Sequence, residues 1–253
     1  MRIDAARVLT PDGLVGPATV VVEDGVIAGV ESCTSAPDRT IGPGFVDLQV
    51  NGFDDVDCAA ADADWDRFAA LQHATGVTTW CSTLVTAPLD VMRERLDRVP
   101  GFVHLEGPFL SKPGAHPPDL LRDPDLDWLR ALPDKVRLVT LAPERPGAVE
   151  ATRLLSDRGV TVSLGHTSAT HGQVAACADA GARMVTHLFN GMEPLHHRTP
   201  GVVGAALTDD RLVAGLIADL VHVHPVAIAV AFRAKPGRIA LVTDAIAWSA
   251  ARI

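Results

Sequence analysis

The sequence has little of what marks several protein classes. Charged residues make up only 21% of its 253 residues and apolar residues 47%, a composition that excludes an intrinsically disordered chain. No stretch approaches 18 uncharged apolar residues, which argues against a membrane-spanning helix. Residues 1–4 lack the apolar run of a secretion signal. Positive charge is also in deficit, because the net charge is −9, and this disfavours nucleic acid or an anionic membrane as the main partner.

Cysteine is scarce as well. The four cysteines, Cys33, Cys58, Cys81 and Cys177, lie far apart and form no CxxC pair. This spacing excludes a disulfide framework and is typical of reduced thiols. We therefore expect a cytoplasmic protein.

The length suits one large α/β domain or two small domains. The positions of the turn residues favour a division of the chain into a small and a large part. The first 42 residues hold short β-branched runs separated by Asp12-Gly13 and Asp24-Gly25, which are hairpin turn signals. Gly42-Pro43-Gly44 closes this region. We expect a small β unit over 1–42, a partial β-sandwich, and a catalytic domain over 43–253.

Strands and helices alternate after residue 42, and the number of strands indicates the architecture. Eight candidate strands at regular spacing predict a parallel sheet, and eight is the number that closes a (β/α)8 barrel of the TIM type. An open doubly wound sheet is the alternative, but residues 51–54 are not the Gly-rich phosphate turn that it would need. The candidate strands are 45–51, 77–84, 102–106, 136–142, 160–165, 183–188, 212–219 and 238–244, with helices over 64–74, 89–98, 147–157, 170–180 and 225–234.

Metal-binding and titratable side chains stand at the ends of these strands. Glu106 ends the third strand, His166 follows the fifth, His187 ends the sixth and Asp244 ends the eighth. Each of them alone is more often a capping or hydrogen-bonded core residue. In a parallel barrel, however, all carboxyl ends share one face. Two imidazoles and a carboxylate form a standard catalytic zinc shell, and a further Asp can transfer protons.

At these residues the sequence resembles the N-acetylglucosamine-6-phosphate deacetylase family of the amidohydrolase superfamily. The resemblance covers nearly the whole chain and depends chiefly on HLEGPF at 104–109 and THLFNGM at 186–192. Further matching segments are PGFVDLQVNG at 43–52, GAH at 114–116, GHTSAT at 165–170, RTPG at 198–201 and LVTDA at 241–245.

The resemblance implies a role for each matching position. It implies one divalent ion per subunit, zinc by preference, on Glu106, His166 and His187, with Asp244 as the catalytic acid and base. It implies that His222 contacts the substrate and polarises its acetamide, and that Arg198 binds the phosphate across a homodimer interface. The remaining positions that it implies as substrate contacts are Ala115, His116, Asn190 and Gly191. The implied reaction converts N-acetylglucosamine 6-phosphate to glucosamine 6-phosphate and acetate.

The sequence departs from the resembled pattern in two places. Gln49 and Asn51 stand where the superfamily usually has His-x-His, and because amides are weaker ligands we expect a mononuclear site. The sequence also stops nine residues after Asp244, so we expect the closing helix and the remaining β-domain strands to be missing. This leaves two alternatives open: another amidohydrolase that acts on an N-acyl or cyclic amide, and a truncated, inactive homologue that is less stable or depends on oligomerisation.

Overall fold

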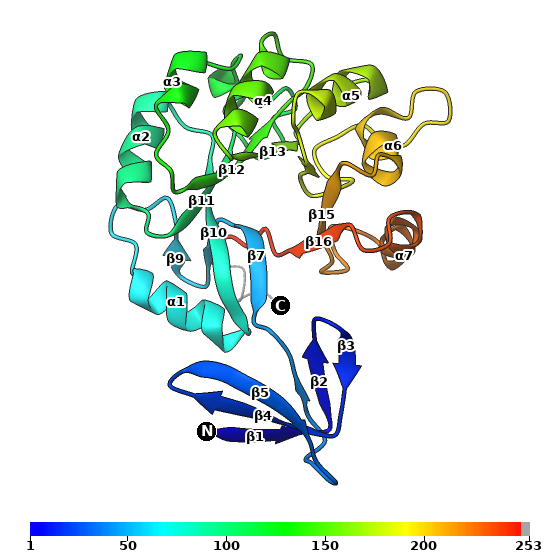
Figure 1. The fold of residues 1–253 in the computed structure, drawn as a ribbon. Helices are drawn as coiled ribbons and strands as arrows, with labels where there is room; N and C mark the ends of the chain where they lie inside the picture. The colour runs from blue at the N-terminus through cyan, green and yellow to red at the C-terminus, as the bar shows by residue number, and fades with distance from the viewer. Residues whose placement is uncertain (249–253) are drawn as a thin grey trace. The chain divides into compact units, whose positions relative to one another are not determined.

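The computed structural model describes residues 1–248, and the chain divides into two compact units, Met1–Phe45 and Val46–Ile253 (Figure 1). The last five residues, 249–253, lie outside the described part. The predicted boundary between the units 1–42 and 43–253 stays a prediction.

The N-terminal unit consists of two small three-stranded sheets. Its β4–β5 hairpin turns at Asp24 and Gly25, whose φ values of 50° and 78° are those that a type I′ turn requires. A small core of Ala5, Val8, Ala18 and Val20 is buried between the strands. The sheets run β1–β4–β5 and β3–β2–β6, with β1 Arg2–Ala5, β2 Arg7–Thr10, β3 Gly13–Val15, β4 Ala18–Glu23, β5 Val26–Ser32 and β6 Thr40–Ile41.

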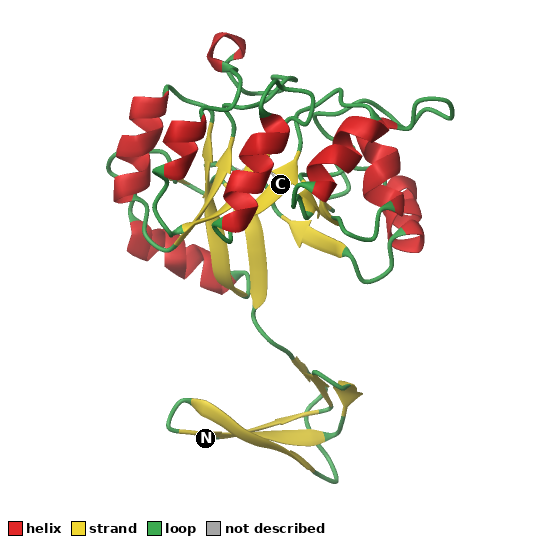
Figure 2. Cartoon of the chain, turned by 45° about the horizontal axis from the view of Figure 1, so that its top comes forward, coloured by secondary structure: helices red, strands yellow, loops and turns green. Residues whose placement is uncertain are grey.

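The second unit confirms the predicted eight-stranded parallel barrel. The strands follow one another around the sheet in chain order, and helices surround them on the outside (Figure 2). The strands are β7 Phe45–Val50, β10 Val77–Val85, β11 Phe102–Glu106, β12 Val136–Leu141, β13 Thr161–Leu164, β14 Met184–Val185, β15 Val213–Ile217 and β16 Ile239–Val242. A small hairpin, β8 Gly52–Phe53 and β9 Val56–Asp57, follows β7.

The helices match the predicted positions, and two further ones were not predicted. One of these is only five residues long, and the other, α6, is buried along nearly its whole length, so that its sequence has no polar face to reveal a helical period. The α-helices are α1 Trp65–Ala74, α2 Leu89–Arg98, α3 Leu126–Arg130, α4 Ala148–Asp157, α5 His171–Asp179, α6 Gly201–Thr208 and α7 Pro225–Ala234, with a 3-10 turn at Pro118–Leu120. None of them has the length and apolar character needed to cross a bilayer.

The barrel closes between β7 and β16 by few contacts. Val50 and Ala245 form one isolated parallel bridge, and Asn51 N donates to Ala245 O over 2.8 Å. The Thr243 hydroxyl donates to Asp47 Oδ2 over 2.5 Å. Up to residue 248 no helix follows β16, and Leu241 on this strand is 53% exposed. On this side of the seam the Leu241 side chain is therefore not covered by a helix among residues 1–248.

Candidate active site

Three of the predicted residues converge at the carboxyl ends of the strands. Glu106 is the last residue of β11, while His166 and His187 each follow a strand by two residues. Their ligand atoms all lie within 4.8 Å of one another. His187 Nε2 is 3.0 Å and His166 Nε2 is 3.3 Å from Glu106 Oε1, and all three residues are buried. Both histidines have a left-handed backbone, with φ of 48° and 27°, at the point where the chain leaves the strand.

The hydrogen bonds of the two histidines fix which ring nitrogen carries the proton. His166 Nδ1 donates to the carbonyl of Lys112 over 2.9 Å, and His187 Nδ1 donates to the carbonyl of Asn190 over 3.1 Å. Since a carbonyl can only accept, each neutral ring presents a bare Nε2 lone pair. These two lone pairs face each other over 3.1 Å and also face the carboxylate. Three acceptors that converge in this way fit a divalent cation.

The charges of the cluster reinforce that arrangement. Without a metal, burial by itself favours the neutral form of Glu106, but hydrogen bonds from His166 and His187, which form when Nε2 is protonated, hold the pKa of Glu106 well below its usual range. Burial likewise lowers the pKa of His187, yet the hydrogen bond and charge of Glu106 outweigh it, so that the pKa is raised. The cluster therefore retains one carboxylate charge and attracts either a proton or a cation.

Two glycines make room for the His166 ring. A Cβ on Gly191 would lie 3.1 Å from His166 Nδ1, and one on Gly114 would lie 3.1 Å from His166 Cε1. Both glycines have a positive φ. A side chain at either glycine would therefore strain the backbone and press on the His166 ring.

We expect Gly191→Ala to displace His166 and to lower the affinity for metal about tenfold or more, as disturbing the support of a ligand does. Gly159→Ala is the matched control. Gly159 has a φ of 73°, and a Cβ at this position would meet nothing within 4 Å, so the substitution adds the backbone strain without the contact. Metal content after dialysis against a weak chelator measures the difference. Equal occupancy in the two variants would contradict the expectation.

Asp244 lies next to this cluster and is held by two amides. Gln49 Nε2 donates to Asp244 Oδ1 over 3.1 Å and Asn51 Nδ2 donates to the same oxygen over 2.7 Å. Gln49 Nε2 also lies 3.1 Å from Glu106 Oε1. Burial and the negative charge of Glu106 raise the pKa of Asp244 to about 6. A carboxyl group with such a pKa can both accept and return a proton near neutral pH.

The residues predicted to contact substrate divide into two groups. His116, Asn190 and Gly191 adjoin the cluster. His116 Nε2 is 3.9 Å from Glu106 Oε2, Asn190 O accepts from His187 Nδ1, and the missing side chain of Gly191 leaves room for the His166 ring. Ala115 is exposed beside His116. Thr86 accepts or donates a 2.8 Å hydrogen bond at His116 Nδ1, which fixes that ring.

His222 and Arg198 belong to the second group, which no described contact joins to the cluster. His222 Nδ1 is 2.7 Å from Asp219 Oδ2, and its side chain is 57% exposed. Leu220, two residues before it, has a φ of 67°, a left-handed conformation that costs a leucine about 1–2 kcal/mol. Arg198 is exposed and lines a cavity of about 430 Å³ with Thr170, Glu193 and His196.

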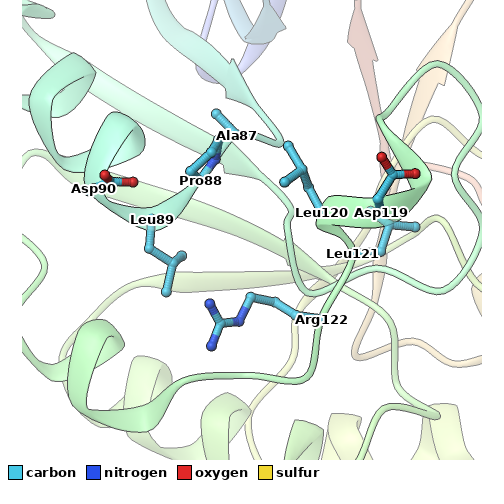
Figure 3. Close-up of a pocket in the computed structure, with 8 residues that line it drawn as sticks. All are labelled: Ala87, Pro88, Leu89, Asp90, Asp119, Leu120, Leu121 and Arg122. Atoms are coloured by element: carbon cyan, nitrogen blue, oxygen red, sulfur yellow. The ribbon is translucent and has the colours of Figure 1, made fainter.

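A second cavity, of about 520 Å³, lies between the loops that follow β10 and β11. Figure 3 shows its lining, in which Leu89 and Arg122 come from opposite sides. No residue of this cavity was predicted from the sequence to be functional.

A polar layer in the barrel interior was also missed. His104 is fully buried and bonds Thr140 Oγ1 through Nε2 over 2.7 Å, and Thr83 lies 3.2 Å from its Nδ1. Thr186 continues the layer by a 2.7 Å hydrogen bond to Thr140. Burial lowers the pKa of His104 to about 4, so the ring is neutral. The signal in the sequence was the alternation along β11, which points His104 to the same side of the sheet as Glu106.

The parallel barrel, with its carboxylate and histidines at the carboxyl face, has the amidohydrolase fold. Comparison with known proteins agrees. The N-acetylgalactosamine-6-phosphate deacetylase of Escherichia coli O157:H7 is 40% identical over 265 residues, which cover 96% of this chain and 70% of that protein. The N-acetylglucosamine-6-phosphate deacetylase of Bos taurus is 43% identical over 235 residues, covering 81% of this chain and 57% of that protein.

Among solved structures, the chain superposes with a TM-score of 0.91 on a variant of N-acetyl-D-glucosamine-6-phosphate deacetylase from Mycobacterium smegmatis in complex with N-acetyl-D-glucosamine-6-phosphate. The two chains are 36% identical, and the match covers 99% of this chain and 72% of that one. No family model matches the sequence. The chain belongs to the N-acetylglucosamine-6-phosphate deacetylase family. It spans between 57% and 70% of the length of these two curated relatives.

Proposed function

We propose that the chain, with one zinc ion, hydrolyses the acetamide of N-acetylglucosamine 6-phosphate to glucosamine 6-phosphate and acetate. The observation that carries the proposal is the convergence of two bare imidazole nitrogens and the Glu106 carboxylate beside Asp244. Family membership supports the choice of substrate class. The amide nitrogen of Gln49, which stands between the two carboxylates, supports a site for one metal rather than two.

Each residue of the site has a separate role in the proposed reaction. Glu106, His166 and His187 would hold a divalent ion, which would supply the Lewis acidity needed for water to attack an amide at neutral pH. Asp244 accepts the proton of the attacking water and returns it to the departing amine. His222, oriented by Asp219, donates a hydrogen bond to the acetamide oxygen as negative charge develops there. Ala115, His116, Asn190 and Gly191 contact the sugar phosphate.

Arg198 is proposed to bind the substrate phosphate in the neighbouring subunit of a homodimer. Its exposure and its place in the lining of the 430 Å³ cavity support this. A guanidinium matches phosphate oxygens in two places, so Arg198 suits the binding of a phosphate that lies far from the reacting amide.

Arg198→Ala is expected to raise KM for the phosphorylated sugar about tenfold or more while kcat changes little, because the lost interaction is remote from the reacting bond. N-acetylglucosamine without phosphate is the control substrate and should show no change in kcat/KM. An unchanged KM for the phosphorylated sugar would place the phosphate elsewhere.

One relative acts, by its name, on the galacto epimer, so N-acetylgalactosamine 6-phosphate is a second candidate substrate. Acetate release by the zinc-loaded protein from both 6-phosphates, and from the same sugars without phosphate, tests the proposal. Preference for N-acetylglucosamine 6-phosphate supports it. Preference for the epimer moves the assignment to the second candidate, and no release from any of them contradicts both.

The four cysteines are free thiols. Reduced thiols are typical of a reducing compartment, which supports the proposal of a cytoplasmic location.

A further inference from the structure

The seam between β7 and β16 is joined mainly by side chains. Asp47, Gln49 and Asn51 alternate along β7 and its end, so they point to the same side of the sheet. Asp47 accepts hydrogen bonds from Thr243, and Gln49 O accepts one from Asp244 N over 2.8 Å. The amides of Gln49 and Asn51 reach the side chain of Asp244 itself.

Those two amides form hydrogen bonds to only one oxygen of the Asp244 carboxylate. Both donate to Oδ1, whereas Oδ2 accepts no hydrogen bond from any residue between 1 and 248. We propose that Gln49 and Asn51 are positioning residues, which hold Asp244 by Oδ1 and thereby present Oδ2 to the proton that is transferred. The proposal rests on the proposed function, in which Asp244 is the acid and base.

Neutral amides suit this task better than cationic side chains. A guanidinium or ammonium group beside Asp244 would lower its pKa by about 1–3 units and weaken it as a base. An amide N–H orients the carboxylate without adding a full charge. The carboxylate also fixes the amide, because the oxygen of Asn51 would be repelled by Asp244 if the group were turned over.

The oxygen of the Asn51 amide indicates that this residue does not serve stability alone. Asn51 Oδ1 is buried and has no hydrogen-bond donor among residues 1–248. An unpaired buried acceptor costs about 1–3 kcal/mol, a cost that an apolar residue of the same size would avoid. Asn51 makes its one side-chain hydrogen bond to Asp244, whereas Gln49 also contacts Glu106 and could act through the metal.

Asn51→Leu is therefore the variant that tests the inference. We expect kcat for N-acetylglucosamine 6-phosphate to fall about 10- to 100-fold, the size of loss that misplacing a reacting group causes, while KM and zinc content stay unchanged. In an Asp244→Asn background the same substitution should lower the residual rate less than about twofold, because the group through which it acts is gone.

Thr243→Val is the matched control. It removes the Thr243–Asp47 hydrogen bond from the same seam but leaves both amides on Asp244, so it should lower Tm without reducing kcat more than about threefold. An equal loss of kcat in Thr243→Val and Asn51→Leu, or an additive loss in the Asp244→Asn background, would overturn the inference. So would a fall in zinc content that accounts for the lost rate.

Crystal structures of the zinc-loaded protein and of Asn51→Leu separate this inference from the proposed function. If the unsubstituted protein releases no acetate, the proposed function fails, but the structures still report on the carboxylate. A rotated or doubly oriented Asp244 in the variant supports the positioning role. An unmoved Asp244 overturns it.

Discussion

Asp244→Asn is expected to lower kcat about 10³- to 10⁴-fold while zinc content and the Kd for substrate stay near those of the unsubstituted protein. The reason is that an amide can neither take the proton of the attacking water nor return one to the departing amine, and general acid–base catalysis contributes factors of this size. Asn is nearly isosteric with Asp, so the substitution removes the chemistry and preserves the shape. Single-turnover acetate release and equilibrium substrate binding measure the two quantities separately.

Asp47→Asn is the control for this substitution. Asp47 is a second buried carboxylate of the same seam, and burial raises its pKa despite hydrogen bonds from Thr243 and Gln49. Its replacement should lower Tm and leave kcat within about threefold. Near-normal turnover in Asp244→Asn would remove Asp244 from the mechanism, and an equal loss in both variants would assign the effect to the seam.

The position of Asp244 could be inferred from the sequence because it depends on topology. A parallel barrel brings every carboxyl end to one face, so the placement of Glu106, His166 and His187 followed once the strands were located. The strand limits were less accurate at these same ends. The sixth strand was predicted over 183–188 but covers only Met184–Val185, because the chain turns at His187 to direct its ring into the cluster.

The finer features of the site depend on hydrogen bonds that residue types alone do not determine. The carbonyls that fix His166 and His187 belong to Lys112 and Asn190, and any residue can supply a carbonyl. The hydrogen bonds from Gln49 and Asn51 to one oxygen of Asp244 likewise depend on how β7 and β16 are paired. Local periodicity says nothing about such pairings across the barrel, and it gives no conformation for the long loop that carries Arg198.

Removing the metal is expected to make stability depend on pH in a direction that identifies His187 as a ligand. Without the metal, the raised pKa of His187 means that the folded state holds a proton that the unfolded state has begun to release above about pH 6.5. This contribution is fully present below pH 6.5 and is lost as the pH rises through the raised value. Relative to the zinc-loaded protein, in which the metal replaces that proton, the metal-free protein should therefore lose stability as the pH rises above about 6.5.

The gap in Tm between zinc-loaded and metal-free protein should accordingly widen as the pH rises. At zinc concentrations about 1,000-fold above Kd the stabilisation is about 4 kcal/mol, which corresponds to roughly 8–16 °C for a chain of this size. His104 and His116 leave this gap unchanged, because burial lowers the pKa of each to about 4 in both forms of the protein and their contributions cancel.

Thermal unfolding at several pH values, with zinc or with a chelator, measures this gap. His187→Asn should abolish both the gap and its pH dependence, while His73→Asn, which changes an exposed histidine in the last turn of α1, should preserve both. A gap that narrows with rising pH would contradict the assignment, because a ligand that must lose its proton binds metal more tightly in base than in acid.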